Sequence, residues 1–235
     1  MRLLVFTKPL DVYSPFIETC EKLSKQVRVI YPEQHPKRKD PAFEEMLGEC
    51  REFKPDVIIS FYYNRIIQAE FLSLAQLAVN FHGSLLPNYA GSHALNWQII
   101  NGEKISGVTI HELTSAIDGG KIIDQDSFCI DFEDTAREVL KKGIDCSVGL
   151  LTSFIKDYQL GEVKLREQMK SGAEFVCRKR SPTDGEITKD MSQLEAYNMI
   201  RALVSPWPGA FYYDKDDNKV ILNEYLSMEE VKRIL

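Results

Sequence analysis

The residue types best suited to chemistry lie in a short stretch, VNFHGSLLPNYAG, which starts at Val79. Asn80 and His82 are two positions apart, so in an extended strand their side chains project to the same side. Asp118 comes directly before two glycines, where a loop can return its carboxylate to the imidazole of His82. An amide, an imidazole and a carboxylate suit acyl transfer to an amine, because amide and imidazolium N–H groups can stabilise a developing oxyanion.

The role of the imidazole has two alternatives at this point. The carboxylate of Asp118 is expected to raise the pKa of His82 from its reference of roughly 6.5 and to fix its tautomer. As an imidazolium, His82 would donate a hydrogen bond to the oxyanion; as a neutral ring, it would accept the amine proton as a general base. The spacing alone is also compatible with a structural role for His82.

An open sheet is the framework that the first half of the chain predicts. Short β-rich runs alternate with helical patterns, which is typical of a Rossmann-like α/β fold with a mainly parallel sheet and helices on both faces. Strands are expected at residues 3–6, 27–31, 57–60 and 78–81, with helices starting near 14 and 41 and one over 70–74. In such sheets ligands bind beyond the carboxyl ends of the strands, where Asn80 and His82 stand.

The second half of the chain continues this sheet and then changes character. A helix is expected over 94–100, strands over 108–111 and 121–130, a long helix over 136–155, a further helix over 194–203, and a hairpin of 211–213 with 219–222. Residues 1–180 are therefore expected to form the main domain, and residues 181–235 a short C-terminal subdomain that contains the hairpin.

Composition disfavours several classes of function. The formal net charge is −6 and the chain has no long Lys/Arg run, the cluster at 37–39 being short, so a nucleic-acid partner is not expected. No apolar run is long enough for a membrane span or signal peptide, and the five cysteines form no C-x-x-C pair, so a reducing cytoplasm is expected. The first strand is not followed by G-x-G-x-x-G, which disfavours a dinucleotide cofactor.

The remaining histidines receive structural interpretations. His93 and His111 could join His82 as zinc ligands, but no carboxylate or cysteine completes a recognisable spacing, so no metal is expected. His35, between prolines and basic residues, is expected on a surface loop.

The motifs around Asn80 resemble those of the 10-formyltetrahydrofolate-dependent formyltransferases. The family's Asn-x-His followed by Ser-Leu-Leu-Pro appears at 80–87, its Gly-Val-Thr at 107–109, and its Asp-x-Gly at 118–120. Four further segments, PDVIISFYY, LNWQIINGE, CRKRSPTDGEI and SPWPGAFYY, resemble the nucleotide-sugar N-formyltransferases, including the formyltransferase half of the bifunctional enzyme that acts on UDP-4-amino-4-deoxyarabinose. The resemblance covers roughly residues 55–213.

This resemblance implies site residues and substrates. It implies catalytic roles for Asn80, His82 and Asp118, and a Rossmann-like folate-binding catalytic domain over residues 1–180. The formyl carrier is expected to contact positions matching Arg65, Ile66, Ile67, Thr114, Ser115, Ala116, Ile117 and Asp118. Asn88 and Tyr89 are the expected contacts to the sugar or its diphosphate.

The expected acceptor is a nucleotide-linked amino sugar, with dTDP-4-amino-4,6-dideoxyglucose as the first choice, in the biosynthesis of surface polysaccharide. UDP-4-amino-4-deoxyarabinose, glycinamide ribonucleotide and methionyl-tRNA are the alternatives, as is a folate-binding protein without turnover. The loop 88–92 lacks the basic residues common in the family, which leaves the nucleotide open. A homodimer is the assembly considered, although the sequence does not define the subunit count.

Overall fold

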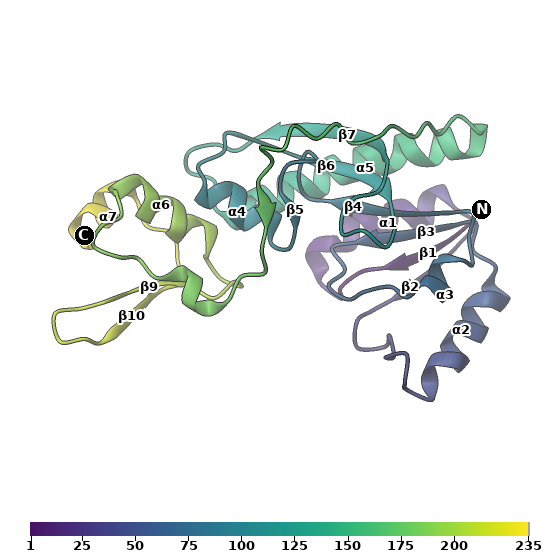
Figure 1. The fold of residues 1–235 in the computed structure, drawn as a ribbon, viewed down its shortest axis with the longest axis horizontal. Helices are drawn as coiled ribbons and strands as arrows, with labels where there is room; N and C mark the ends of the chain where they lie inside the picture. The colour runs from purple at the N-terminus through teal and green to yellow at the C-terminus, as the bar shows by residue number, and fades with distance from the viewer. Residues whose placement is uncertain (235) are drawn as a thin grey trace.

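A six-stranded sheet forms the centre of the larger part of the molecule in the computed structural model, which describes residues 1–234 (Figure 1). Its strands lie in the order β2-β1-β3-β4-β6-β7, with parallel pairing from β2 to β4 and antiparallel pairing of β4 with β6 and of β6 with β7. The strands are β1 (Arg2–Phe6), β2 (Gln26–Ile30), β3 (Val57–Phe61), β4 (Leu77–His82), β6 (Ile105–Glu112) and β7 (Ile122–Cys129).

Seven α-helices accompany the strands within residues 1–234. They are α1 (Ser14–Leu23), α2 (Ala42–Phe53), α3 (Ala69–Leu72), α4 (Ala94–Ile100), α5 (Ala136–Leu160), α6 (Gln193–Ala202) and α7 (Met228–Ile234). The longest, α5, begins with a capping box in which Thr135 and Glu138 satisfy each other's backbone N–H groups, and it ends at Gly161 in the left-handed conformation.

Alternate residues of the central strands supply two separate cores. Leu3 and Val5 of β1 pack with Phe16 of α1 and Leu151 of α5 on one face of the sheet. The intervening Leu4, with its counterparts in neighbouring strands, packs under α2 and α3 on the other face. Because successive strand side chains point to opposite faces, an uninterrupted apolar run is what a sheet covered on both sides requires. The expected Rossmann-like class is confirmed.

The C-terminal part forms a smaller body beside α4 and the start of α5, at the left of Figure 1. It contains α6, α7 and an antiparallel hairpin of β9 (Ala210–Tyr213) with β10 (Lys219–Leu222). Ile99 of α4 and Val139 of α5 share one buried cluster with Tyr197 of α6 and Val231 of α7. A further short parallel pair joins β5 (Ala90–Gly91) to β8 (Val176–Cys177).

One expectation about the loops is wrong. His35 is buried rather than on the surface, with only 2% of its area exposed. Its ring packs on Phe6 and Phe71, and its Nδ1 lies 2.6 Å from the hydroxyl of Tyr63. The neighbouring prolines and basic residues gave no sign of this burial, because it results from contacts with the distant residues Tyr63 and Phe71.

Candidate active site

A cavity of about 550 Å³ opens beyond the carboxyl ends of β1, β3 and β4. Small-molecule sites commonly have volumes of about 300–1,000 Å³, so this space can hold a substrate of ordinary size. Its lining comes from segments that are far apart in the sequence: Lys8, Tyr13, Tyr62–Asn64, Asn80–Gly83, Gly91–Asn96, Ile117, Asp118, Leu140, Lys179 and Trp207.

The structure brings Asn80, His82 and Asp118 together at this cavity. Asn80 and His82 project from the same side of β4, as their spacing predicts. Asp118 belongs to the loop that follows β6 and has a left-handed φ of 46°, an uncommon conformation that Asp tolerates better than most residues. One carboxylate oxygen, Oδ2, lies 3.5 Å from Nδ1 of His82. The glycines after Asp118 therefore do allow the return of the carboxylate toward the imidazole.

His111 is a member of this cluster that sequence reasoning set aside with the zinc alternative. It lies directly opposite Asn80 in the antiparallel pairing of β4 with β6, so both side chains share one face of the sheet. Its Nε2 lies 3.1 Å from Nδ2 of Asn80 and 3.5 Å from Oδ1 of Asp118. Its position depends on the antiparallel pairing of β4 with β6, for which the sequence carries no local signal.

The hydrogen bonds of His111 fix its tautomer and the amide of Asn80. Nδ1 lies 2.9 Å from the carbonyl oxygen of Glu112, which can only accept, so Nδ1 carries the hydrogen. With Nδ1 as the donor, Nε2 accepts from the Nδ2 amino group of Asn80. The second N–H of that amide remains free for a ligand in the cavity.

Burial lowers the pKa of His82, while the nearby carboxylate of Asp118 and the carbonyl of Tyr89 act in the opposite direction. The neutral ring donates its Nε2–H to the carbonyl oxygen of Tyr89 at 2.8 Å. Nδ1, beside Asp118, is then the nitrogen that can receive a proton. This direction differs from the sequence-based expectation of a raised pKa, because the ring is only 8% exposed and its desolvation outweighs the carboxylate.

Asp118 is held as a carboxylate. Burial alone would raise its pKa, but His111 and His82 in their protonated forms and the backbone N–H of Gly91 lower it to about 2. The Gly91 N–H donates to Oδ2 at 2.8 Å, and Gln168 donates to the backbone carbonyls of Asp118 and Gly120. The carboxylate and the loop that carries it are therefore both fixed.

The loop after β4 is fastened to the sheet by Thr109. Its hydroxyl donates to the carbonyl of Ser84 at 2.6 Å and accepts from the backbone N–H of Leu86 at 3.0 Å. Gln98 of α4 donates to the carbonyl of Gly83. Through these bonds the Gly-Val-Thr and Ser-Leu-Leu-Pro motifs together hold the segment that continues to Tyr89 and Gly91.

The two loops expected to hold the formyl carrier lie at the cavity only in part. Ile117 and Asp118 line it, as do Tyr62–Asn64 immediately before the expected residues 65–67. Arg65 donates to the carbonyl of His35, Ile66 is 86% exposed and Ile67 is buried. Thr114, Ser115 and Ala116 are exposed. The carrier contacts at 65–67 and 114–118 stay a prediction.

The two expected sugar contacts do not reach the cavity lining. Asn88 is exposed, and the buried ring of Tyr89 points its hydroxyl at Glu103, to which it donates at 2.6 Å. The backbone carbonyl of Tyr89, by contrast, holds His82. Their role in binding the acceptor stays a prediction.

Neither a metal site nor a membrane-spanning helix is found in the part of the chain that the structure describes. Within residues 1–234, no group of three or more His, Cys, Asp or Glu side chains is arranged to hold a metal ion. Over the same residues, no helix combines the length and apolar character needed to cross a membrane.

The fold and the groups gathered at its cavity are those of an α/β group-transfer enzyme. Comparison with known proteins makes this more specific: residues 4–154 match the Formyl transferase family. The chain belongs to the formyl transferase family. The family that the motifs predict is confirmed.

Among curated proteins, the chain is 37% identical over 216 residues to the bifunctional polymyxin resistance protein ArnA of Wigglesworthia glossinidia brevipalpis. The match covers 90% of this chain and 32% of ArnA, so the chain spans about a third of that relative.

Solved structures share the fold at lower identity. A 4-N formyltransferase from Francisella tularensis has a TM-score of 0.75 at 22% identity, covering 96% of this chain and 98% of that one. HypX from Aquifex aeolicus in complex with tetrahydrofolic acid has a TM-score of 0.73 at 22% identity, covering 91% of this chain and 36% of HypX.

Proposed function

We propose that this protein transfers the formyl group of 10-formyltetrahydrofolate to the amino group of a nucleotide-linked amino sugar. The observation that carries the proposal is the convergence of Asn80, His82 and Asp118 on one cavity, in the protonation states described above. Members of the family move formyl groups, the relative ArnA is 37% identical, and the fold is shared with a 4-N formyltransferase and with a HypX that binds tetrahydrofolic acid.

The first step is attack of the unprotonated amine on the formyl carbon. A C–N bond forms and the formyl oxygen becomes an oxyanion. Asn80 donates its free amide N–H to that oxygen, because its other N–H is already committed to His111. A donor that is fixed before the reaction stabilises the developing charge without reorganising, and one such donor contributes on the order of a hundredfold in turnover.

The second step is the transfer of one proton. Nδ1 of His82 takes the surplus proton from the former amine, and Asp118 stabilises the resulting imidazolium. The proton then goes to the folate nitrogen as the bond between that nitrogen and the formyl carbon breaks. The products are the N-formyl sugar and tetrahydrofolate, and no proton is gained or lost overall. The lowered pKa of His82 favours this general-base role over that of a permanently charged oxyanion donor.

The carrier fits between the loops at 62–67 and 114–118. Two large apolar side chains, Ile66 and Ile117, are 86% and 83% exposed there, which is uncommon for isoleucine and suits an aromatic pterin ring. Tyr62 and Tyr63 line the adjoining wall of the cavity.

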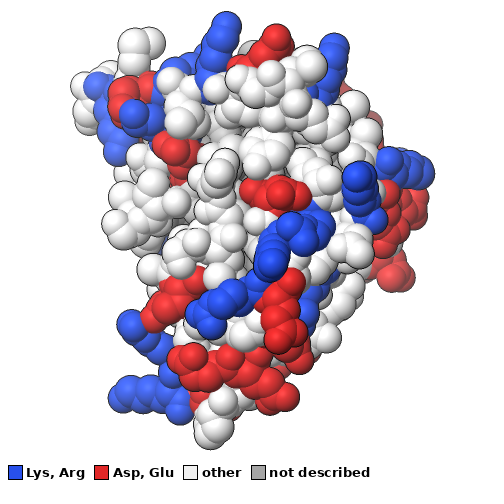
Figure 2. Space-filling view, turned by 90° about the vertical axis from the view of Figure 1, so that its right-hand side faces the viewer, with Lys and Arg blue, Asp and Glu red and all other residues white. Residues whose placement is uncertain are grey.

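The acceptor is proposed to be dTDP-4-amino-4,6-dideoxyglucose, made for surface polysaccharide in the cytoplasm. The net charge of −6 supports a small acceptor over RNA. Figure 2 shows one face of the molecule, on which Lys and Arg side chains are interspersed with Asp and Glu and do not form a broad basic surface. A homodimer remains part of this proposal.

The test is incubation of the purified protein with 10-formyltetrahydrofolate and a panel of acceptors, with release of tetrahydrofolate as the readout. The panel contains dTDP- and UDP-linked 4-amino sugars, glycinamide ribonucleotide and charged initiator tRNA. We expect turnover with a nucleotide amino sugar, and a loss of a hundredfold or so in Asn80→Ala with folate binding retained. Formylation of the tRNA alone, or normal turnover in Asn80→Ala, would refute the proposal.

A further inference from the structure

The charges that line the cavity are distributed unevenly. Asp118 is the single carboxylate in the lining, and two imidazoles and a backbone N–H already surround it. The lining also contains two lysines, Lys8 and Lys179. Neither forms an ion pair with a carboxylate of the described residues 1–234. Two unpaired cations in one cavity indicate a site for an anionic ligand.

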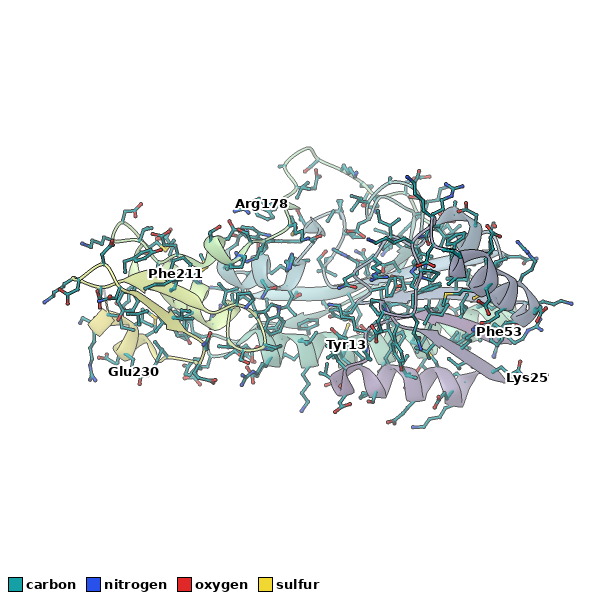
Figure 3. The ribbon with its side chains drawn as sticks, turned by 90° about the horizontal axis from the view of Figure 1, so that it is seen from below. Tyr13, Lys25, Phe53, Arg178, Phe211 and Glu230 are labelled. Atoms are coloured by element: carbon teal, nitrogen blue, oxygen red, sulfur yellow. The ribbon has the colours of Figure 1, made fainter. Side chains whose placement is uncertain are left out.

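Different elements hold these two lysines in place. Lys8 follows β1 at its carboxyl end and is partly buried, and this burial lowers its pKa. Lys179 lies two residues beyond β8, which pairs with β5 at the edge of the cavity. The residue before it, Arg178, is anchored by a two-bond ion pair with Asp184 at 2.7 and 2.8 Å. Figure 3 shows Arg178 between the larger body and the C-terminal part.

His93 lines the same cavity as the two lysines and supplies a neutral donor. Its Nδ1 accepts the backbone N–H of Arg180 at 3.4 Å, so the hydrogen of the neutral ring is on Nε2. Burial lowers the pKa of His93, and Arg180, Lys8 and Lys179 lower it further. Three cations are thus close enough to act on one ring.

Arg180 extends the cluster into an adjoining pocket of about 70 Å³, which shares His93, Asn96 and Trp207 with the cavity. One guanidinium nitrogen, Nη2, donates to the carbonyl of Asp184, but Nη1 is buried and has no partner among the described residues. A buried, unpaired guanidinium N–H is costly unless a ligand supplies the acceptor.

We infer that Lys8, His93, Lys179 and Arg180 form a binding site for the diphosphate of a nucleoside diphosphate. Two ammonium groups, an imidazole N–H and a guanidinium N–H match a ligand with a negative charge on each of two phosphates. The inference rests on the proposed function and names the part of the acceptor held at this end of the cavity. Lys8, Lys179 and Arg180, from two segments distant in the sequence, would supply the positive charge that the loop at 88–92 lacks.

The experiment measures binding of dTDP and of inorganic pyrophosphate by calorimetry, without any formyl transfer. We expect the wild-type protein to bind both, Lys8→Met and Lys179→Met each to weaken dTDP binding by about tenfold, and added salt to reduce the difference. Methionine keeps the length and packing of the stem, so both variants are expected to fold. Lys25→Met is the matched control, because Lys25 is exposed at the far end of the larger body (Figure 3).

The outcomes separate this inference from the proposed function. Absence of dTDP binding by the wild type, or wild-type binding by both lysine variants, overturns the site even if the enzyme formylates an amino sugar. Weakened dTDP binding in the variants supports the site even if no amino sugar is formylated. A rise in the KM for 10-formyltetrahydrofolate with unchanged dTDP affinity would assign the cations to the carboxylates of the folate and overturn the inference.

Discussion

His82 lies between two acceptors, the carbonyl of Tyr89 and the carboxylate of Asp118, and is itself buried. The ring is neutral because burial lowers its pKa by more than the carboxylate of Asp118 raises it. When Nδ1 takes up a proton, the carboxylate of Asp118 already lies beside it. The same carboxylate therefore has little effect on the resting enzyme and a larger effect once the ring is charged.

The rate should depend on pH through this ring. In the proposed mechanism the neutral form of His82 is the base, so kcat/KM should rise as pH increases through its pKa, which burial holds below the reference of 6.5. In Asp118→Asn the charge that raises the pKa is lost, so the acid limb should move to still lower pH while the plateau falls. Because the acceptor amine is the same in both profiles, the difference between them reports on His82.

The control for this measurement is Asp216→Asn, which removes an exposed carboxylate from the turn of the β9–β10 hairpin. Its profile should coincide with that of the wild type. An acid limb that moves to higher pH in Asp118→Asn would contradict the assignment of His82 as the base.

His111 is expected to act by positioning the amide of Asn80. His111→Leu removes the acceptor at 3.1 Å and frees the amide to rotate, so kcat should fall by about tenfold, the usual effect of one lost hydrogen bond, with little change in KM. His111→Gln offers an oxygen to the same amide and should recover part of the loss. If both variants lower kcat equally, or raise KM instead, the proposed positioning role is wrong.

Among the secondary-structure elements, the sequence predicts those with strong local signals. Helix α4 was expected over residues 94–100 and has those bounds, and the β9–β10 hairpin also forms as expected. Apolar periodicity and turn residues act within a few positions, which makes such elements visible. The antiparallel pairing of β6 with β4 was not visible, because it depends on contacts between distant segments. For the same reason the sequence did not predict that His111 lies beside Asn80.

Short strand pairs, and residues that become neighbours only through such pairs, are equally difficult to predict from the sequence. β5 and β8 have two residues each, too few for any periodicity, and α7 was also missed. Asn80, His82 and Asp118 were found because family motifs mark them, whereas the approach of Lys179 to the cavity depends on the β5–β8 pair.

Gly91 of β5 cannot be replaced by a residue with a side chain without strain. Its φ is 108°, and a Cβ would lie 2.2 Å from the backbone carbonyl of Cys177. Gly91→Ala should therefore destabilise the protein by about 1–3 kcal/mol and lower turnover, since its N–H holds Asp118. Thermal unfolding and steady-state kinetics measure the two effects.

Gly149→Ala is the matched substitution for Gly91→Ala. Gly149 lies in α5 with nothing within 4 Å of a built Cβ, so alanine should raise stability by about 0.5–1 kcal/mol and leave turnover unchanged. Equal effects of the two substitutions would show that the contact with Cys177 does not matter.

In the whole molecule, the C-terminal part is joined to the larger body by a continuous apolar cluster and by buried hydrogen bonds. Asn96 of α4 donates to the carbonyl of Ala202 at 2.7 Å, and the buried Arg201 donates to the carbonyl of Asp134 at 2.8 Å. The boundary between 180 and 181 that the sequence suggests stays a prediction, and these contacts cross it.

Removal of residues 181–235 is therefore expected to unfold part of the remaining chain, residues 1–180, as well. Buried side chains of α4 and α5, such as Ile99 and Val139, would lose their cover, at a cost of about 1.5–3 kcal/mol each against a total stability of about 5–15 kcal/mol. A chain of residues 1–180 should show no cooperative thermal transition and should bind hydrophobic dyes. A sharp transition at the temperature of the full chain would instead establish 1–180 as an independent domain.

The β5–β8 pair joins two segments through main-chain atoms, with Ala90 opposite Val176 and Gly91 opposite Cys177. Main-chain hydrogen bonds are largely indifferent to which side chains follow them along the chain. The residues just beyond Cys177 can therefore change during evolution, or be exchanged by a protein engineer, without disturbing the anchor of Asp118. Changes in ligand preference that arise at 178–185 are therefore expected to leave Asn80, His82 and Asp118 in place.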